Sequence, residues 1–411
     1  MQSLNKIQRP PSARHDLAII RRATTAFFAI DGFIFASWAV RIPAIKAQTA
    51  ASPAALGLAL LGASAGAVAT MTMSGALCRR FGSERITVVG GVLLSAALLL
   101  PPLARSALAL GLGLVVFGIG YGGLNVAMNS LAVDVVAALR RPVMPSFHAA
   151  WSFGGLAGAS VGGLLAPHAS PLRHLALVTL LGLAVTAVCG RTLLTHPMPA
   201  PRDGNEGDDS VDDSPAPVAS RAVRAGSAGS AGSAGVWPVV LLFGLIALCS
   251  AYGEGAIGDW GALHLRQDLG AGAGLAAAGY AAFALAEACG RLAGSRLLES
   301  LGQTRVLVFG GLTACAGMLA AALAPLLPLA LAGFALTGLG VANMFPAAMT
   351  RAGLLAGPNG VALASTLGYT GFLLGPPAIG FLASSAGLGT GLTTVSALAL
   401  VAALLAGLAR D

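Results

Sequence analysis

Apolar runs of about 20 residues recur along almost the whole chain. A helix of that length crosses the roughly 30 Å of hydrocarbon in a bilayer. Of the 411 residues, 56% are hydrophobic and 10% are charged, whereas soluble domains carry about 25% charged residues. The runs are continuous and do not alternate with polar residues, which excludes a transmembrane β-barrel. The sequence therefore predicts an all-α integral membrane protein.

Twelve such runs can be counted, and each is predicted to be a membrane-spanning helix. They cover residues 20–44, 55–77, 84–104, 107–133, 146–166, 172–194, 237–263, 272–294, 304–324, 327–349, 360–383 and 390–409. The first run follows basic residues, as the apolar part of a signal peptide does. It is too long for one, however, and it ends without a small-residue cleavage site. We expect it to be retained as a helix.

Basic residues are distributed unequally between the two sides that twelve spans define. With a cytoplasmic N-terminus, 19 of the 24 Lys and Arg residues lie on the cytoplasmic side and 5 lie outside. This is the asymmetry that the positive-inside rule describes. We therefore predict that both termini are cytoplasmic. The pI near 9.8 then reflects membrane topology, and binding to nucleic acid is not expected.

The segment between the sixth and seventh spans differs in composition from the rest of the chain. Residues 195–236 are rich in Pro, Gly, Ser and Asp and hold six of the sixteen acidic residues, which predicts a disordered cytoplasmic linker. Its simplest role is a tether, and a regulatory or partner-binding role is the alternative. The linker separates a cytoplasmic N-tail (1–19) and an N-terminal six-helix bundle (20–194) from a C-terminal six-helix bundle (237–411).

The two halves of the chain resemble one another. The segment FGSERITVVGG (81–91) aligns with LGQTRVLVFGG (301–311) at an offset of 220 residues. At the same offset, Gly118 and Gly120 correspond to Gly338 and Gly340. An even number of spans between the copies indicates a parallel repeat about an axis along the membrane normal. Two pseudo-symmetric bundles facing one another across a central cavity are therefore predicted.

Several sequence motifs of soluble enzymes and nucleotide-binding proteins are absent or lie in the wrong structural context. GIGYGG (118–123) satisfies the dinucleotide pattern GxGxxG, but it follows no strand, and small residues in a membrane helix serve close packing. The chain has no Walker A motif and no HExxH, and its two GxSxG matches (62–66 and 158–162) lie within apolar runs and not at a strand-to-helix elbow, so we expect a non-enzyme driven by a gradient. Its five cysteines show no CxxC spacing. Neither a metal nor a cofactor is expected.

Ionisable residues inside the spans are the main candidates for function, since each costs a few kcal/mol to bury and is usually turned toward a cavity. Asp31, Glu254 and Glu287 are the predicted proton-coupling residues, because a desolvated carboxyl can take up and release protons near neutral pH. For Asp31, the alternative is a structural pair with Arg41 or with another helix. For Glu287, the alternative is an ion pair with Arg291, one turn further on.

Polar and aromatic residues near these acids are the candidates for substrate binding. Trp38 is expected to share a helix face with Asp31 and to wall the site. Asp259 is expected at the outer entrance, with solvation at the membrane surface as the alternative, and Trp260 is expected to anchor at the interface. Structural hydrogen bonds are the alternative for the remaining candidates. The full predicted set is Trp38, Asn125, Asn129, His148, Trp151, Asp259 and Asn343.

The two-bundle layout, the loop GALCRRFGSER (75–85) and its diverged copy GRLAGSRLLESLGQTR (290–305) resemble the major facilitator superfamily. WAVRIPAIK (38–46), MPSFHAAWSFGG (144–155) and EGAIGDWGALHL (254–265) resemble its fucose-permease-like branch, particularly the YbjJ-like members. The resemblance implies alternating access and strengthens Asp31 as a proton or substrate site. The fourth span departs from the fucose permease, because it offers amides where that protein has a Glu.

The superfamily's loop pattern G-x-x-x-D-R-x-G identifies candidate gating residues. Gly75, Arg80 and Gly82 match the pattern, but Arg79 stands at the acidic position. The latch that an Asp normally supports there must therefore be altered or must use Glu84 instead. The predicted gating set is Gly75, Arg80, Gly82, Arg85 and Arg291.

Together these features predict a monomeric, multi-pass transporter of a bacterial inner membrane. Proton-coupled symport of a small polar or sugar-like solute is the first expectation. Proton-antiporting efflux of drugs or metabolites is the alternative within transport, although the drug-efflux pattern of the fifth span lacks its Gly-Pro here. A receptor that does not transport is the alternative outside it.

Overall fold

The computed structural model describes residues 11–139, 143–196 and 236–409, and these residues form helices and short connections without a strand. The first half contains α1 (Pro11–Ala39), α2 (Ile42–Thr49), α3 (Pro53–Phe81), α4 (Ser83–Ala97), α5 (Leu100–Leu103), α6 (Ala107–Leu139), α7 (Met144–Leu165) and α8 (Pro171–Thr195). The second half contains α10 (Val236–Ala256), the π-helical turn η2 (Ile257–Gly261), α11 (Ala262–Gln267), α12 (Ala273–Leu301), α13 (Gln303–Ala322), α14 (Leu327–Val341), α15 (Met344–Ala386) and α16 (Leu388–Leu408).

Most of the predicted spans correspond to single helices. Within the described residues, nine helices are long and apolar enough to span a membrane, and the pair α1 and α2, bent by 44°, makes a tenth. The predicted spans 146–166 and 360–383 correspond to α7 and to the second half of α15. Part of the predicted N-tail (1–19) lies outside the described residues. Helix α1 starts at Pro11, before the first predicted span (20–44). Nearly all of the predicted linker lies outside the described residues.

Helix α15 contains two antiparallel segments. The ring of Phe345 lies against Gly368, and a Cβ on Gly360 would collide with the carbonyl of Ala352. A straight helix would separate Phe345 from Gly368 by roughly 34 Å at 1.5 Å per residue. The chain therefore folds back near residues 353–359, and the two halves of α15 complete the tenth span and form the eleventh. The part of the chain that the structure describes thus forms twelve membrane-spanning segments, as predicted.

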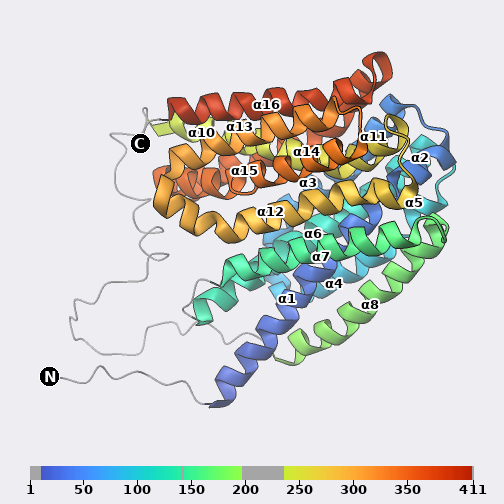
Figure 1. The fold of residues 1–411 in the computed structure, drawn as a ribbon. Coiled ribbons are helices and arrows are strands. Elements are labelled where there is room, and N and C mark those ends of the chain that lie inside the picture. Colours follow the sequence, from blue (N-terminus) through green and yellow to red (C-terminus); the bar gives the residue numbers. More distant parts are fainter. Residues whose placement is uncertain (1–10, 140–142, 197–235, 410–411) are drawn as a thin grey trace.

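The packing of the two halves confirms the internal repeat. In the first half, α1 packs on α7 and α8, α3 on α6, and α4 on α6 and α8. In the second half, α10 packs on α15 and α16, α12 on α14, and α13 on α14 and α16. Each of these pairs occupies the corresponding place in its half. The protein is thus two pseudo-symmetric six-helix bundles, which lie one above the other in Figure 1.

The glycines shared by the repeats have the same packing role in both bundles. A Cβ on Gly118 would collide with the carbonyl of Ala63, and a Cβ on Gly338 with the carbonyl of Phe283, 220 residues later. In the same way, Gly120 of α6 lies against the backbone of Leu94 of α4, and Gly340 of α14 lies against the backbone of Ala314 of α13. Close helix crossings of this kind need small residues. The packing interpretation of GIGYGG is therefore confirmed.

The bundles touch most closely at one end of the molecule, where α2 and α11 lie. A Cβ on Gly57 of α3 would stand 2.5 Å from the carbonyl oxygen of Pro376 of α15. On the other side of the interface, a Cβ on Gly163 of α7 would stand 3.1 Å from the carbonyl oxygen of Gly274 of α12. Toward the end where α1 begins and α16 ends, the helices of the two bundles diverge (Figure 1).

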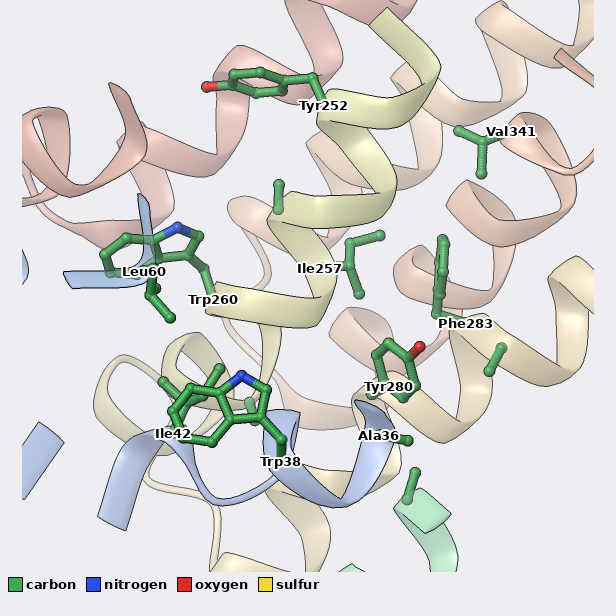
Figure 2. Close-up of a cluster of buried hydrophobic side chains, with 14 of the residues drawn as sticks. Ala36, Trp38, Ile42, Leu60, Tyr252, Ile257, Trp260, Tyr280, Phe283 and Val341 are labelled. Carbon is green, nitrogen blue, oxygen red and sulfur yellow. The ribbon is translucent and has the colours of Figure 1, made fainter. Parts of the chain in front are cut away.

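Large aromatic side chains fill the interface at this closed end. Trp260 of η2 is completely buried and lies beside Leu60 of α3, while Trp38 of α1 lies beside Ile42 of α2 (Figure 2). The expected role of Trp260 as an anchor at the membrane surface is therefore wrong. A side chain buried between the two bundles cannot contact the lipid headgroups.

Candidate functional site

Six polar or charged side chains meet where the two bundles face each other, away from the closed end. We call them the central polar layer: Asp31 of α1, Trp151 and Ser152 of α7, Glu254 of α10, and Glu287 and Arg291 of α12. Three of the six come from each bundle.

Asp31 is completely buried, and its partner is an indole. Trp151 Nε1 donates a hydrogen bond to Asp31 Oδ2 at 2.9 Å. A close crossing of α1 and α7 positions the two residues, since a Cβ on Gly32 would collide with the Trp151 carbonyl and a Cβ on Gly154 with the Ala29 carbonyl. Asp31 Oδ1 has no hydrogen-bond partner within the described residues. One carboxylate oxygen is therefore available to a proton or a ligand.

Arg291 joins the two acids of the second bundle. Its Nη2 lies 2.8 Å from Glu287 Oε1 and 3.6 Å from Glu254 Oε2. Glu254 also accepts a longer hydrogen bond, 3.4 Å, from the hydroxyl of Ser250 one turn earlier. Glu287 is 2% exposed. The predicted pair of Glu287 and Arg291 is therefore present, and Glu254 is added to it.

Ser152 connects this cluster to the first bundle. Arg291 Nη1 donates to Ser152 Oγ at 3.3 Å, and Ser152 directly follows the tryptophan that holds Asp31. A continuous path of contacts thus runs from the carboxyl of α1 through α7 to the acids of α10 and α12. The two bundles share one polar network at this depth.

The charges of the central polar layer do not balance. Two carboxyls share the single guanidinium of Arg291, and Asp31 forms no ion pair within the described part of the chain. An uncompensated buried charge costs several kcal/mol. The layer is therefore favourable only when protons or a bound cation compensate for the surplus carboxylates.

Aromatic rings surround the polar layer and come from both bundles. Phe35 of α1 lies 5.9 Å from Tyr121, 6.2 Å from Trp151 and 6.2 Å from Tyr280, measured between ring centroids. Tyr280 of α12 also packs against Phe283, with 6.1 Å between the ring centroids. Aromatic faces beside carboxylates favour ligands with apolar or cationic surfaces.

Three predicted substrate residues lie around this layer. Asn125 and Asn129 follow Tyr121 at successive turns of α6, so all three lie on one helix face, and the Asn129 amide donates to the Asn125 carbonyl at 2.8 Å. His148 is exposed and meets the ring of Phe28 edge-on at 5.4 Å. It lies one turn before Trp151 and Ser152 on α7.

The remaining predicted substrate residues lie elsewhere or have structural partners. Trp38 packs against Phe117 at 6.3 Å in the buried interface, and the indole that contacts Asp31 is that of Trp151. Asn343 lies at the break between α14 and α15 and donates to the Gly290 carbonyl at 2.9 Å. Asp259 is partly exposed in the π-helical turn.

The π-helical turn changes the relation between Glu254 and Asp259. Five residues span about 140° of a regular α-helix, whereas i→i+5 hydrogen bonding brings residues five apart toward the same face. Gly258 in this turn leaves room for Phe35, since a Cβ there would lie 3.3 Å from the ring. The turn therefore lies directly against α1.

Arg41 has a partner other than Asp31. Its Nε donates to His174 Nδ1 at 2.8 Å, and its Nη1 donates to the Ala169 carbonyl at 3.1 Å, just beyond the end of α7. A cation is favourable at a helix C-terminus. Arg41 therefore holds the bend between α1 and α2 against α7 and α8, and the structural pair of Asp31 with Arg41 is excluded.

Four of the five predicted gating residues lie at the opposite end from the closed interface, whereas Arg291 lies in the central polar layer. Gly82 and its repeat partner Gly302 have φ of 88° and 80° at the junctions of α3 with α4 and of α12 with α13, a conformation that favours glycine. Arg80 stacks over Phe81 at 5.2 Å. Gly75 faces open space apart from the side chain of Arg79, and Arg85 is exposed on α4.

Four residues of the site were missed by sequence reasoning. Phe35, Tyr121, Ser152 and Tyr280 are neutral residues in apolar runs, and no charge in the sequence marks them. Tyr121 is four residues before Asn125, which is the one available signal. Among the described residues, no group of three or more His, Cys, Asp or Glu could hold a metal ion.

Two repeat-related bundles with ionisable residues between them define a secondary membrane transporter. The profile of the Major Facilitator Superfamily matches residues 23–254. An uncharacterised MFS-type transporter of Yersinia pestis is 31% identical over 385 residues, 93% of each chain. Membrane protein MosC of Rhizobium meliloti is 30% identical over 379 residues, 92% of this chain and 86% of that protein. The chain belongs to the Major Facilitator Superfamily.

Solved structures share the fold at low sequence identity. A bacterial homologue of the human lysosomal transporter Spinster, inward-facing and unoccupied, gives a TM-score of 0.75 at 18% identity, with 98% of each chain covered. A mutant of the nucleoside transporter NupG gives a TM-score of 0.71 at 13% identity, with 95% of this chain and all of that chain covered. The fucose-permease-like branch remains a prediction.

Proposed function

We propose that this transporter is a proton-coupled symporter of a small polar solute. The observation that carries the proposal is the charge surplus of the central polar layer, where Glu254 and Glu287 share Arg291 and Asp31 has no cation. Protonation removes this surplus. A bound proton therefore lowers the free-energy cost of burying the central polar layer away from water.

The path through Trp151 and Ser152 supports coupling between the bundles. Neutralising Asp31 weakens its hydrogen bond to Trp151, since a bond to a charged acceptor is roughly twice as strong as a neutral one. Ser152 holds Arg291 from the next position of α7. Proton occupancy on α1 can therefore change how tightly α7 holds α12. Hydroxyl groups of a solute would bind Tyr121, Asn125 and Asn129.

A flux measurement tests this function. The full chain is purified, hits are found by thermal shift, and each hit is tested in proteoliposomes under an imposed pH gradient. We expect a hit to accumulate above its external concentration when the outside is acidic and a protonophore to abolish the accumulation. A solute flux that is independent of the pH gradient would contradict proton coupling.

Efflux by proton antiport is the second candidate, and the rings of Phe35, Tyr121 and Tyr280 favour it because amphipathic cations bind aromatic faces. Expression in a drug-sensitive host separates the two functions. Raised tolerance to several cationic compounds would support efflux, whereas unchanged tolerance together with gradient-driven uptake supports symport.

The closed end leads to a prediction about alternating access. If the termini are cytoplasmic, as we propose, this end faces outward and the arrangement of the bundles corresponds to an inward-facing state. Gly57→Ala places a Cβ 2.5 Å from the Pro376 carbonyl oxygen, and such overpacking costs about 1–3 kcal/mol. We expect the equilibrium between the states with a closed and an open outer end to shift toward the open state by roughly five- to 150-fold. A Cys introduced at Ser64, which donates to the Phe372 carbonyl across the same interface, should become accessible to an impermeant maleimide.

The matched control for this variant is Gly111→Ala. Its nearest neighbour would be Ala59 Cα at 3.4 Å, within the first bundle, so labelling at Ser64→Cys should stay at the wild-type level. Equal labelling of the two variants would show that the contact of Gly57 with Pro376 does not close the outer end.

A further inference from the structure

An apolar groove runs between α4 and α8 on the outer surface of the first bundle. It encloses about 470 Å³ and is lined by Val88 and Val92 of α4 and by Leu183, Ala187 and Leu194 of α8, with Arg191 near one end. The helices touch closely beneath it, because a Cβ on Gly190 would lie 2.8 Å from Val88. The groove is separate from the central polar layer.

Among the described residues, Arg191 is the charged residue of this lining, and none of the lining residues is acidic. Its side chain is exposed, and its guanidinium makes no hydrogen bond or ion pair within the described residues. Arg85, also exposed, lies one turn before Val88 on α4. The end of the groove nearest the chain termini is therefore positively charged.

We propose that this α4–α8 groove binds one anionic phospholipid, with an acyl chain along its apolar walls and the phosphate at Arg191. The groove faces the bilayer, so an acyl chain is the apolar group present there in quantity. Basic pockets between membrane helices on the cytoplasmic side bind anionic headgroups. A soluble anion fits less well, since it would leave the apolar walls uncovered.

The test uses the full chain in a neutral detergent, titrated with phosphatidylglycerol or phosphatidylcholine, with bound lipid counted by native mass spectrometry. One basic residue near an anionic headgroup contributes about 1 kcal/mol. Arg191→Gln should therefore weaken phosphatidylglycerol binding about fivefold. Ala187→Phe, which keeps the charge and fills the groove, should weaken both lipids.

Arg296→Gln is the matched control, because Arg296 is exposed on α12 at the same end of the molecule but does not line the groove. It should bind phosphatidylglycerol like the wild type. Three results would overturn the proposal: equal binding by Arg191→Gln and Arg296→Gln, equal affinity for the two lipids, or binding that appears only after the acids of residues 203–213 are neutralised. The last would identify the linker as the occupant of the Arg191 end.

Discussion

Asp31→Asn is expected to abolish gradient-driven accumulation while the protein stays folded. The amide has the shape of the carboxyl and can still accept the hydrogen bond from Trp151 Nε1, which is 2.9 Å long in the wild type. It cannot take up or release a proton. Accumulation under a pH gradient should therefore fall at least about tenfold, the change that corresponds to 1.4 kcal/mol of lost coupling free energy. Uptake into proteoliposomes measures it.

Solute exchange without a gradient is the control for this variant. Exchange needs binding and alternating access but no net proton movement, so Asp31→Asn should retain it. Trp151→Phe gives a second comparison, because it keeps a ring beside Phe35 and removes the N–H donor. It should lower gradient-driven accumulation more than solute exchange, because it removes the hydrogen bond that links Asp31 to α7. Accumulation at the wild-type level in Asp31→Asn would show that the coupling proton binds elsewhere.

The fold was largely predictable because its determinants are local and repeated. Continuous apolar runs predict membrane helices from length alone. The offset of 220 residues, found in the sequence, also relates contacts in the structure: Gly118 packs on Ala63, and Gly338 packs on Phe283. Helix ends were less predictable, because α15 continues through the expected loop between the tenth and eleventh spans, where the chain turns within helical hydrogen bonding.

The acids of the site were predictable one at a time, but their relations were not. An acid in an apolar run is conspicuous, whereas the helix face that it meets depends on how helices far apart in the sequence cross. Arg291 and Glu287 were paired from their spacing on one helix. Glu254 joins them from α10, 37 residues earlier, and Ser152 from α7, 139 residues earlier.

Two of the tryptophans, Trp38 and Trp260, were placed less well for the same reason. Trp38 is two turns from Asp31 and was expected to wall the site, and Trp260 was expected at the membrane surface. Both lie in the closed interface between the bundles (Figure 2). Periodicity shows which residues share a face, but the same face of α1 contacts the site at one depth and the opposite bundle at another.

Removing Arg291 should have the largest effect on stability. Arg291→Gln leaves Glu287, 2% exposed, and Glu254 without a cation. Breaking a buried ion pair from one side costs about 3–5 kcal/mol, because the other charge remains buried and unpaired. Thermal unfolding in detergent should show this loss at neutral and alkaline pH. The loss should shrink as the pH falls, since protonation of the two acids removes the unpaired charges.

The double variant Arg291→Gln with Glu287→Gln separates charge balance from packing. It removes one cation and one anion, so we expect it to recover most of the lost stability. Arg296→Gln, at an exposed site on the same helix, should change the unfolding free energy by less than about 0.5 kcal/mol. If Arg291→Gln is as stable as the wild type at every pH, the acids beside it are already neutral. Arg291 would then be free to bind the solute, and Asp31 alone would carry the coupling proton.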